Sequence, residues 1–247
     1  MKKSLIALAF GTLALGIAEF VMMGILPDIA SDLHVSIAEA GHLISAYALG
    51  VCVGAPMLIL ARKHPLKRIL LVLVAVIMAG NVCAALAPNF WTLMAARFVS
   101  GLPHGAYFGV GSIAAEKLAD KGKDSEAVSI MIAGMTIANL LGVPLGTALS
   151  SMLSWRVTFL LVGCWGMIVL YYIWRWIPPV ENLPDTGFRG QFRFLRSPAP
   201  WLLIFATMLG NGGVFCWYSY IYPMLTEISG FQTSSMTALM VLAGFGM

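Results

Sequence analysis

Apolar runs of about 20 residues recur along the whole chain, and each is long enough to cross the hydrocarbon core of a bilayer as a helix. Inside a bilayer the backbone must satisfy its own hydrogen bonds, which permits only helices and closed barrels, and unbroken apolar runs favour helices. Charged residues make up only 11% of the 247 residues, whereas about 25% is typical of soluble domains. The sequence therefore predicts an all-α integral membrane protein.

We predict seven complete spans and the start of an eighth. The complete spans are 4–26, 41–61, 69–87, 90–115, 127–150, 157–177 and 201–225. The eighth begins near residue 234, and Met247 cuts it off too early to cross. Lys2 and Lys3 before an apolar run are also typical of a signal peptide. The run continues past Glu19 to Pro27, however, and the next span follows at once, so we favour a transmembrane helix.

Lysine and arginine lie mostly on one side of the predicted spans. With a cytoplasmic N-terminus, 13 of the 15 basic residues fall in inner segments, whereas the outer loop 27–40 carries Asp28, Asp32 and Glu39 and no lysine or arginine. Inner loops are normally the basic ones. We therefore predict a cytoplasmic N-terminus. The net charge of +4 is explained by inner loops that face anionic lipid, so nucleic acid is not an expected partner.

Residues 178–200 form one long, proline-rich and basic connection. We interpret it as a cytoplasmic linker between an N-terminal six-helix bundle (1–177) and the start of a second bundle (201–247). Shifting the sequence by 196 residues superposes Gly16 on Gly212 and Pro27 on Pro223. This weak repeat indicates that the six-helix unit begins a second time, as in transporters built from repeats.

Arg97 and Glu19 are charged residues that lie deep inside predicted spans, far from the span ends. A charge within the membrane usually faces an interior or a wet cavity and has a partner. Glu19 lies roughly 12 Å and Arg97 roughly 10 Å from the outer ends of their spans, at 1.5 Å per residue. We therefore predict an ion pair between the first and fourth spans. The alternative is that Arg97 extends to the outer headgroups while Glu19 is protonated in lipid.

Small residues suggest close helix packing in two spans. Gly101, Gly105 and Gly109 recur every fourth residue and form a smooth stripe. We expect the stripe to let spans one and four approach, with Val110 off the stripe and tolerant of leucine. Gly142, Pro144 and Gly146 form a second small-residue run, which we expect to bend and pack span five.

Four further polar residues are candidates for a solute cavity: Tyr47, His104, Asn139 and Tyr218. His104 follows Pro103, so a bend beside a titratable ring is expected. Each has a structural alternative. His104 could instead be a proton carrier or a hydrogen-bonded interior histidine, with the latter favoured. Asn139 could bond a neighbouring helix, and tyrosines near span ends are often interface anchors.

Enzyme chemistry finds no support in the sequence. Motifs of metalloproteases, P-loop ATPases and G-x-S-x-G hydrolases are absent. The four cysteines lie far apart in spans, without a C-x-x-C pair, and we interpret them as small buried apolar residues. We expect no catalytic residue, metal or cofactor, and a protein that is monomeric.

Four segments resemble the major facilitator superfamily. ARFVSGLPHGA (96–106) is similar to its fourth-helix arginine motif, GVPLG (142–146) to its antiporter motif, and SWRVTF (154–159) to the entry of helix six. AEFVMMGILPDI (18–29) resembles helix one of the twelve-span drug and sugar efflux branch, and the likeness extends to arabinose efflux permeases. The resemblance implies a proton-coupled antiporter of the bacterial inner membrane that exports a small solute, such as a sugar, by alternating access.

Two departures from that family matter. In GAPMLILARKHPLKR (54–68), Lys63 stands where the family has an acid, and Leu66 stands for the loop glycine, so the inner-gate charge relay is not predicted here. The second departure is length, since about twelve spans are implied. We expect either a transporter, driven by the proton gradient through Glu19 with Arg97 modulating it, or a truncated, non-transporting membrane fragment.

Overall fold

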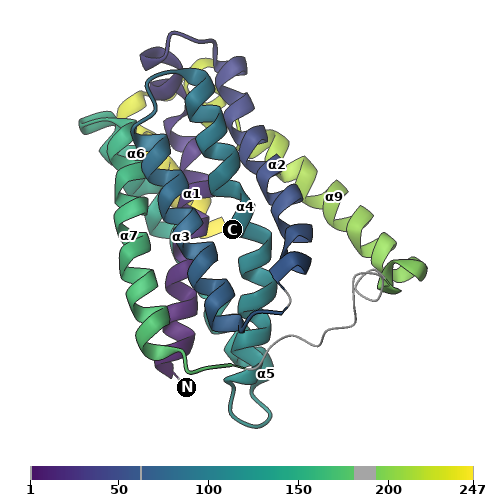
Figure 1. Cartoon of the computed structure of the whole chain (residues 1–247). Coiled ribbons are helices and arrows are strands. Elements are labelled where there is room, and N and C mark those ends of the chain that lie inside the picture. Colours follow the sequence, from purple (N-terminus) through teal and green to yellow (C-terminus); the bar gives the residue numbers. More distant parts are fainter. Residues whose placement is uncertain (1, 62, 181–192, 247) are drawn as a thin grey trace.

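The computed structural model describes residues 2–61, 63–180 and 193–246, and every regular element within them is helical (Figure 1). The predicted all-α fold is confirmed. The first four helices run as α1 Lys2–Asp32, α2 Ile37–Ala61, α3 Leu66–Ala85 and α4 Phe90–Lys117. Span five is divided into α5 Asp124–Ile137, a π-helical turn η1 Ala138–Gly142 and α6 Val143–Met152, and α7 follows at Trp155–Trp176. Most helices extend beyond the predicted spans, because the spans were drawn from the apolar runs alone and the helices continue into the flanking, more polar residues.

Within the described residues, six helical segments are long and apolar enough to cross a membrane: Lys2–Asp32, Ile37–Ala61, Leu66–Ala85, Asp124–Met152, Trp155–Trp176 and Pro198–Tyr218. The helix α4 is not among them, although its 28 residues extend about 42 Å at 1.5 Å per residue. Arg97, His104 and several glycines lower its hydropathy. It packs along α2 and α3 inside the bundle (Figure 1), so its polar residues face protein rather than lipid.

The helix α1 forms the centre of the bundle. Of its most apolar stretch, 67% is buried, against 28% for α2 and 39% for α7. It contacts α2, α4, α5, α6 and α7. Its C-terminal half packs with Leu43, Leu93 and Phe159, and its N-terminal half with Val74, Tyr107 and Ile173.

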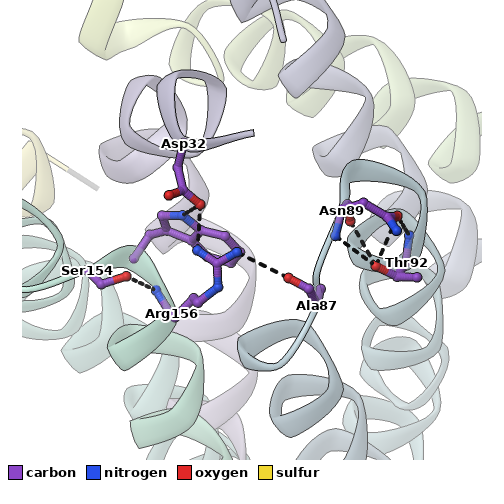
Figure 2. A network of polar contacts seen from close by, with 7 residues as sticks. Asp32, Ala87, Asn89, Thr92, Ser154 and Arg156 are labelled. Carbon is purple, nitrogen blue, oxygen red and sulfur yellow. Dashed lines mark hydrogen bonds and ion pairs between the residues drawn. The ribbon is translucent and has the colours of Figure 1, made fainter. Parts of the chain in front are cut away.

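Polar side chains fix the ends of the helices at the loop end of the bundle shown in Figure 2. Asn89 caps α4 reciprocally with Thr92, because each side chain accepts a hydrogen bond from the other's backbone N–H. Arg156 donates to Asp32 at 2.5 Å and to the Ala87 carbonyl at 3.2 Å. These bonds join the end of α1, the α3–α4 loop and the start of α7, a cluster that we call the brace (Asp32, Ala87, Trp155, Arg156).

The π-helical turn η1 ends two residues before Pro144. Proline has no backbone N–H, so the carbonyl of Leu140, four residues earlier, loses its α-helical donor. Such gaps are a common cause of local changes in helix geometry. The predicted irregularity of span five therefore takes the form of a π turn.

The segments after the linker differ from the bundle. The helix α9 Pro198–Tyr218 stands clear of it, with none of its apolar stretch buried (Figure 1). The short α10 Ile221–Pro223 and α11 Met236–Gly246 return to pack on α1, η1 and α6. The proposed boundaries 1–177, 178–200 and 201–247 stay a prediction, and residues 181–192 of the linker lie outside the described residues.

The cysteine prediction is wrong. Cys52, Cys83, Cys164 and Cys216 are all exposed at the surface of the helices. A small apolar residue on such a helix suits lipid as well as a protein core, so composition could not distinguish the two.

Candidate functional site

Three helices bring four polar side chains together inside the bundle. Glu19 comes from α1, Tyr47 from α2, and Arg97 and His104 from α4. We call these four residues the polar cluster. Arg97 is 0% exposed and Tyr47 is 2% exposed, which is unusual for an arginine. The cluster therefore places charge in the interior of a bundle whose other contacts are mostly apolar.

Glu19 faces His104 rather than Arg97. Its Oε2 lies 3.6 Å from His104 Nε2, and the two side chains retain 18% and 10% of their exposure. The other ring nitrogen, Nδ1, lies 2.8 Å from the Tyr47 hydroxyl. His104 also stacks on Phe108 with the ring centroids 5.3 Å apart. His104 therefore links the acid on α1 to the tyrosine on α2.

Arg97 has other partners than the one predicted. Its Nη1 donates to the Ala18 carbonyl at 2.6 Å. Its guanidinium carbon lies 4.4 Å from the Tyr47 ring centroid and 5.6 Å from that of Phe159. No ion pair with Glu19 forms within the described residues, although the two charges still act on each other electrostatically. The predicted direct pair is corrected: both residues lie in one cluster, but a backbone carbonyl next to Glu19 takes the donor.

Two donors of Arg97 are unused. Nε and Nη2 are buried and have no hydrogen-bond partner among the described residues. A buried donor without a partner costs about 1–3 kcal/mol, and more when it is charged. The guanidinium is therefore held by two aromatic rings and one carbonyl. Its two remaining N–H donors can still bind an anion or a hydroxyl oxygen.

The glycine stripe of α4 faces α2, not α1. A Cβ at Gly101 would lie 3.0 Å from the Tyr47 carbonyl carbon, and one at Gly105 would lie 3.0 Å from Ala55 Cβ. At Gly109 the nearest atom would be 4.0 Å away, on Leu58. The expectation that the stripe brings spans one and four together is corrected, and the close contact between α2 and α4 loosens along the stripe.

Span one instead packs against the small residues of span five. A Cβ at Gly142 would lie 2.9 Å from Ile17 Cδ1, and a Cβ at Gly146 would overlap Val21. Pro144, between them, is buried. The tolerance of Val110 for leucine stays a prediction, but the position argues against it, because Val110 is 0% exposed in the core. Leucine there would overpack rather than fit.

Asn139 and Tyr218 lie outside the polar cluster. Asn139 sits in the π turn, where its Oδ1 is buried without a partner among the described residues. Gly244 of α11 packs against the backbone of Asn139. A Cβ at Gly244 would lie 2.6 Å from the Asn139 carbonyl oxygen. The Tyr218 ring lies 6.2 Å from Phe20 at the end of α9. Their assignment to a solute cavity stays a prediction.

Sequence reasoning missed the aromatic rings and the carbonyl that hold the cluster. Phe159 and Phe108 are ordinary apolar residues in the sequence, and the Ala18 carbonyl has no sequence signal at all. One signal was available: Ala18 adjoins the only acid predicted inside a span. Among the described residues, no three His, Cys, Asp or Glu side chains gather closely enough to hold a metal ion.

The fold and the polar cluster define a polytopic helical membrane protein with charged residues inside its bundle. The sequence pattern of the Major Facilitator Superfamily matches residues 8–247. The chain belongs to this superfamily, which comprises transporters and not enzymes. The resemblance found in the sequence is thus confirmed at the level of the family.

The chain is similar to several named bacterial transporters. It is 50% identical to the "Putative transporter AraJ" of Escherichia coli (strain K12), over 100% of this chain and 63% of the relative. It is 40% identical to the "Inner membrane transport protein YdhP" of the same strain, over 98% and 62%. A "Probable sugar efflux transporter" of Helicobacter pylori (strain G27) is 30% identical, over 98% and 61%. The chain therefore spans less than two thirds of the length of these relatives.

A solved structure supports the fold. The crystal structure of a bacterial homolog to the human lysosomal transporter Spinster, inward-facing and unoccupied, matches with a TM-score of 0.76 at 20% identity. The match covers 98% of this chain and 60% of that one. At this identity the likeness establishes the arrangement of helices and no more.

Proposed function

We propose that the protein containing this chain exports a sugar or similar small solute across the bacterial inner membrane in exchange for protons, by alternating access. The polar cluster carries the proposal. An ionisable side chain inside a membrane bundle is costly and usually marks a proton or solute pathway. Glu19 retains 18% of its side-chain exposure, so water can reach it.

Glu19 is the proposed proton-binding group, and Arg97 modulates it. A carboxyl group that faces a cavity open first to one side and then to the other can take up a proton on one side and release it on the other. A solute that binds only one protonation state is then coupled to the gradient through its different affinity for the two states. Arg97, with two free donors, supplies charge and hydrogen bonds beside that carboxyl.

The choice of solute rests on the relatives. A sugar efflux name occurs among them, and another relative is named an inner membrane transport protein. Arabinose is our first candidate, with Tyr47, His104, Asn139 and Tyr218 as proposed cavity residues. Hydroxyl, amide and imidazole groups suit the many hydroxyls of a sugar, because each can both donate and accept a hydrogen bond.

The test is transport into everted membrane vesicles with an imposed gradient, acid inside. The vesicles come from cells that express the whole reading frame containing this chain, and the probe is radiolabelled arabinose. We expect gradient-driven uptake, and we expect Glu19→Gln to abolish it while solute exchange without a gradient persists. The matched control is Glu126→Gln, since Glu126 is an acid with a 57% exposed side chain beside Lys123.

Two results would contradict the proposal. If the unmodified protein takes up arabinose equally fast with and without the pH gradient, proton coupling is excluded. Undiminished driven uptake by Glu19→Gln would make the buried acid a structural group.

A further inference from the structure

His104 contacts a different partner with each of its ring nitrogens. Nε2 lies 3.6 Å from Glu19 and Nδ1 lies 2.8 Å from the Tyr47 hydroxyl. The Tyr47 ring in turn lies 4.4 Å from the Arg97 guanidinium carbon. Glu19 and Arg97 are therefore connected through His104 and Tyr47, on three different helices.

We propose that His104 shares the coupling proton with Glu19, and that loss of this proton turns Glu19 from His104 to Arg97. The inference rests on the proposed function and adds to it a second proton-binding residue and a defined exchange of partners. His104 is a positioning residue here, because it acts on the solute site through Tyr47 and Arg97.

The hydrogen-bond chemistry of imidazole sets the two states. A charged imidazole donates from both nitrogens, whereas a neutral one donates from one and accepts at the other. With the proton bound, Nε2–H faces the Glu19 carboxylate and Nδ1–H donates to the Tyr47 oxygen. When Nε2 passes its proton to Glu19, whose side chain is 18% exposed, and Glu19 releases it to water, Nε2 is left as an acceptor and Nδ1–H still donates to the Tyr47 oxygen. Tyr47 keeps its own proton throughout, so one proton is taken up and released per cycle.

The unused donors of Arg97 provide the second position for Glu19. Nε and Nη2 are buried and have no partner within the described part of the chain in this arrangement, in which Glu19 faces His104. After deprotonation His104 no longer carries charge, and the carboxylate is attracted to the remaining cation. A carboxylate is a good partner for two guanidinium donors. The state in which Glu19 faces His104 therefore leaves two Arg97 donors without hydrogen bonds, as the proposed exchange requires.

The other groups around His104 are consistent with this exchange. The titratable groups described against the ring are Glu19 on α1 and Tyr47 on α2, and Arg97 on its own helix lies beside the Tyr47 ring. Phe108 covers one face of the ring. Glu19 favours the charged ring and Arg97 opposes it, so moving the carboxylate between them changes proton binding.

The first test observes His104 directly. The other three histidines, His34, His42 and His64, are replaced by glutamine, and the ¹⁵N-histidine-labelled protein is studied by NMR in lipid nanodiscs between about pH 5 and 8. We expect a ring protonated at both nitrogens at the acid end and a single tautomer, with Nε2 accepting, at the alkaline end. In Glu19→Gln the doubly protonated form should not appear in this range. A single tautomer throughout in the unmodified cluster would overturn the proposal, whatever the transport result.

The second test separates this inference from the proposed function. Glutamine at 104 retains a donor and an acceptor but cannot bind the proton, so His104→Gln should lose gradient-driven uptake and keep gradient-free exchange. Driven uptake equal to the unmodified protein would reduce His104 to a structural residue. If the NMR transition occurs but no gradient drives uptake in the unmodified protein, proton sharing stands and proton-coupled export fails.

Discussion

Two arginines in this bundle have opposite surroundings. Arg156 in the brace is 34% exposed in its side chain, and it bonds a carboxylate and a carbonyl and lies 4.1 Å above the Trp155 ring. Arg97 in the polar cluster is fully buried and bonds one carbonyl, and two of its donors have no partner in the part of the chain that the structure describes. The brace satisfies its arginine and joins three segments. The cluster leaves two hydrogen-bond donors of its arginine unused. Such a loss of folding stability is expected at a functional site whose side chains exchange hydrogen-bond partners.

The largest difference should follow from replacing each arginine by methionine, which keeps much of the length and removes the charge. For Arg97→Met we expect gradient-driven uptake to fall to background, with the melting temperature in detergent unchanged or higher. The reason is that an unpaired buried charge is a net cost, and apolar replacement of buried charges is often neutral or stabilising by about 1–4 kcal/mol. A clear fall in melting temperature would mean that Arg97 is mainly a structural residue.

The membrane orientation would sharpen the comparison, because it decides which face the brace occupies. In a cysteine-free background we expect Ala38→Cys, in the loop end next to the brace, to react with an impermeant maleimide in intact cells. Lys121→Cys, in the α4–α5 loop, should react only after permeabilisation. Both positions are exposed, and Ala38 is preferred to the nearby Ser36, whose hydroxyl accepts a hydrogen bond from the Glu39 N–H at 3.1 Å. The reverse pattern would place the N-terminus outside.

The packing beside Arg97 is tested by alanine in the glycine stripe. We expect Gly101→Ala to destabilise the protein by about 1–3 kcal/mol, because the new methyl would meet the Tyr47 backbone, which cannot move away. Gly109→Ala is the matched control and should change the melting temperature little, since its nearest neighbour would be 4.0 Å away. Equal stability of the two variants would mean that α2 and α4 do not need this close approach near the cluster.

The smallest effect should come from the brace. An ion pair this exposed is worth about 0–1 kcal/mol, and the Ala87 bond adds a net contribution of about 1 kcal/mol. Arg156→Met should therefore lower the melting temperature modestly and leave gradient-driven uptake close to normal. A double-mutant cycle with Asp32→Asn measures the pair itself. Loss of uptake with normal stability would show that the brace takes part in transport.

Much of the fold was predictable because residues inside the hydrocarbon core of a bilayer are mostly apolar, so apolar runs mark the membrane-spanning helices. The runs that end near Ala61 and Ile177 became helices close to their predicted limits, the run 4–26 became the longer helix 2–32, and proline and glycine marked the irregular fifth span. The charged residues of the site were predictable for the same reason. Glu19 and Arg97 are conspicuous in apolar runs, and equal depth predicted that they would meet in one site.

The sequence by itself determined which segments cross the membrane, at what depth the polar residues lie and which residues are small enough for close packing. Only the tertiary structure decided which partner each residue has. Glu19 meets His104, Arg97 meets the Ala18 carbonyl, the α4 glycines meet α2, and Val110 is buried while the cysteines are exposed. The physical reason is rotation about the helix axis. In water, an amphipathic pattern shows which face of a helix is buried. In a bilayer, the lipid-facing and protein-facing sides are both apolar, so the sequence gives little information about which side faces which neighbour.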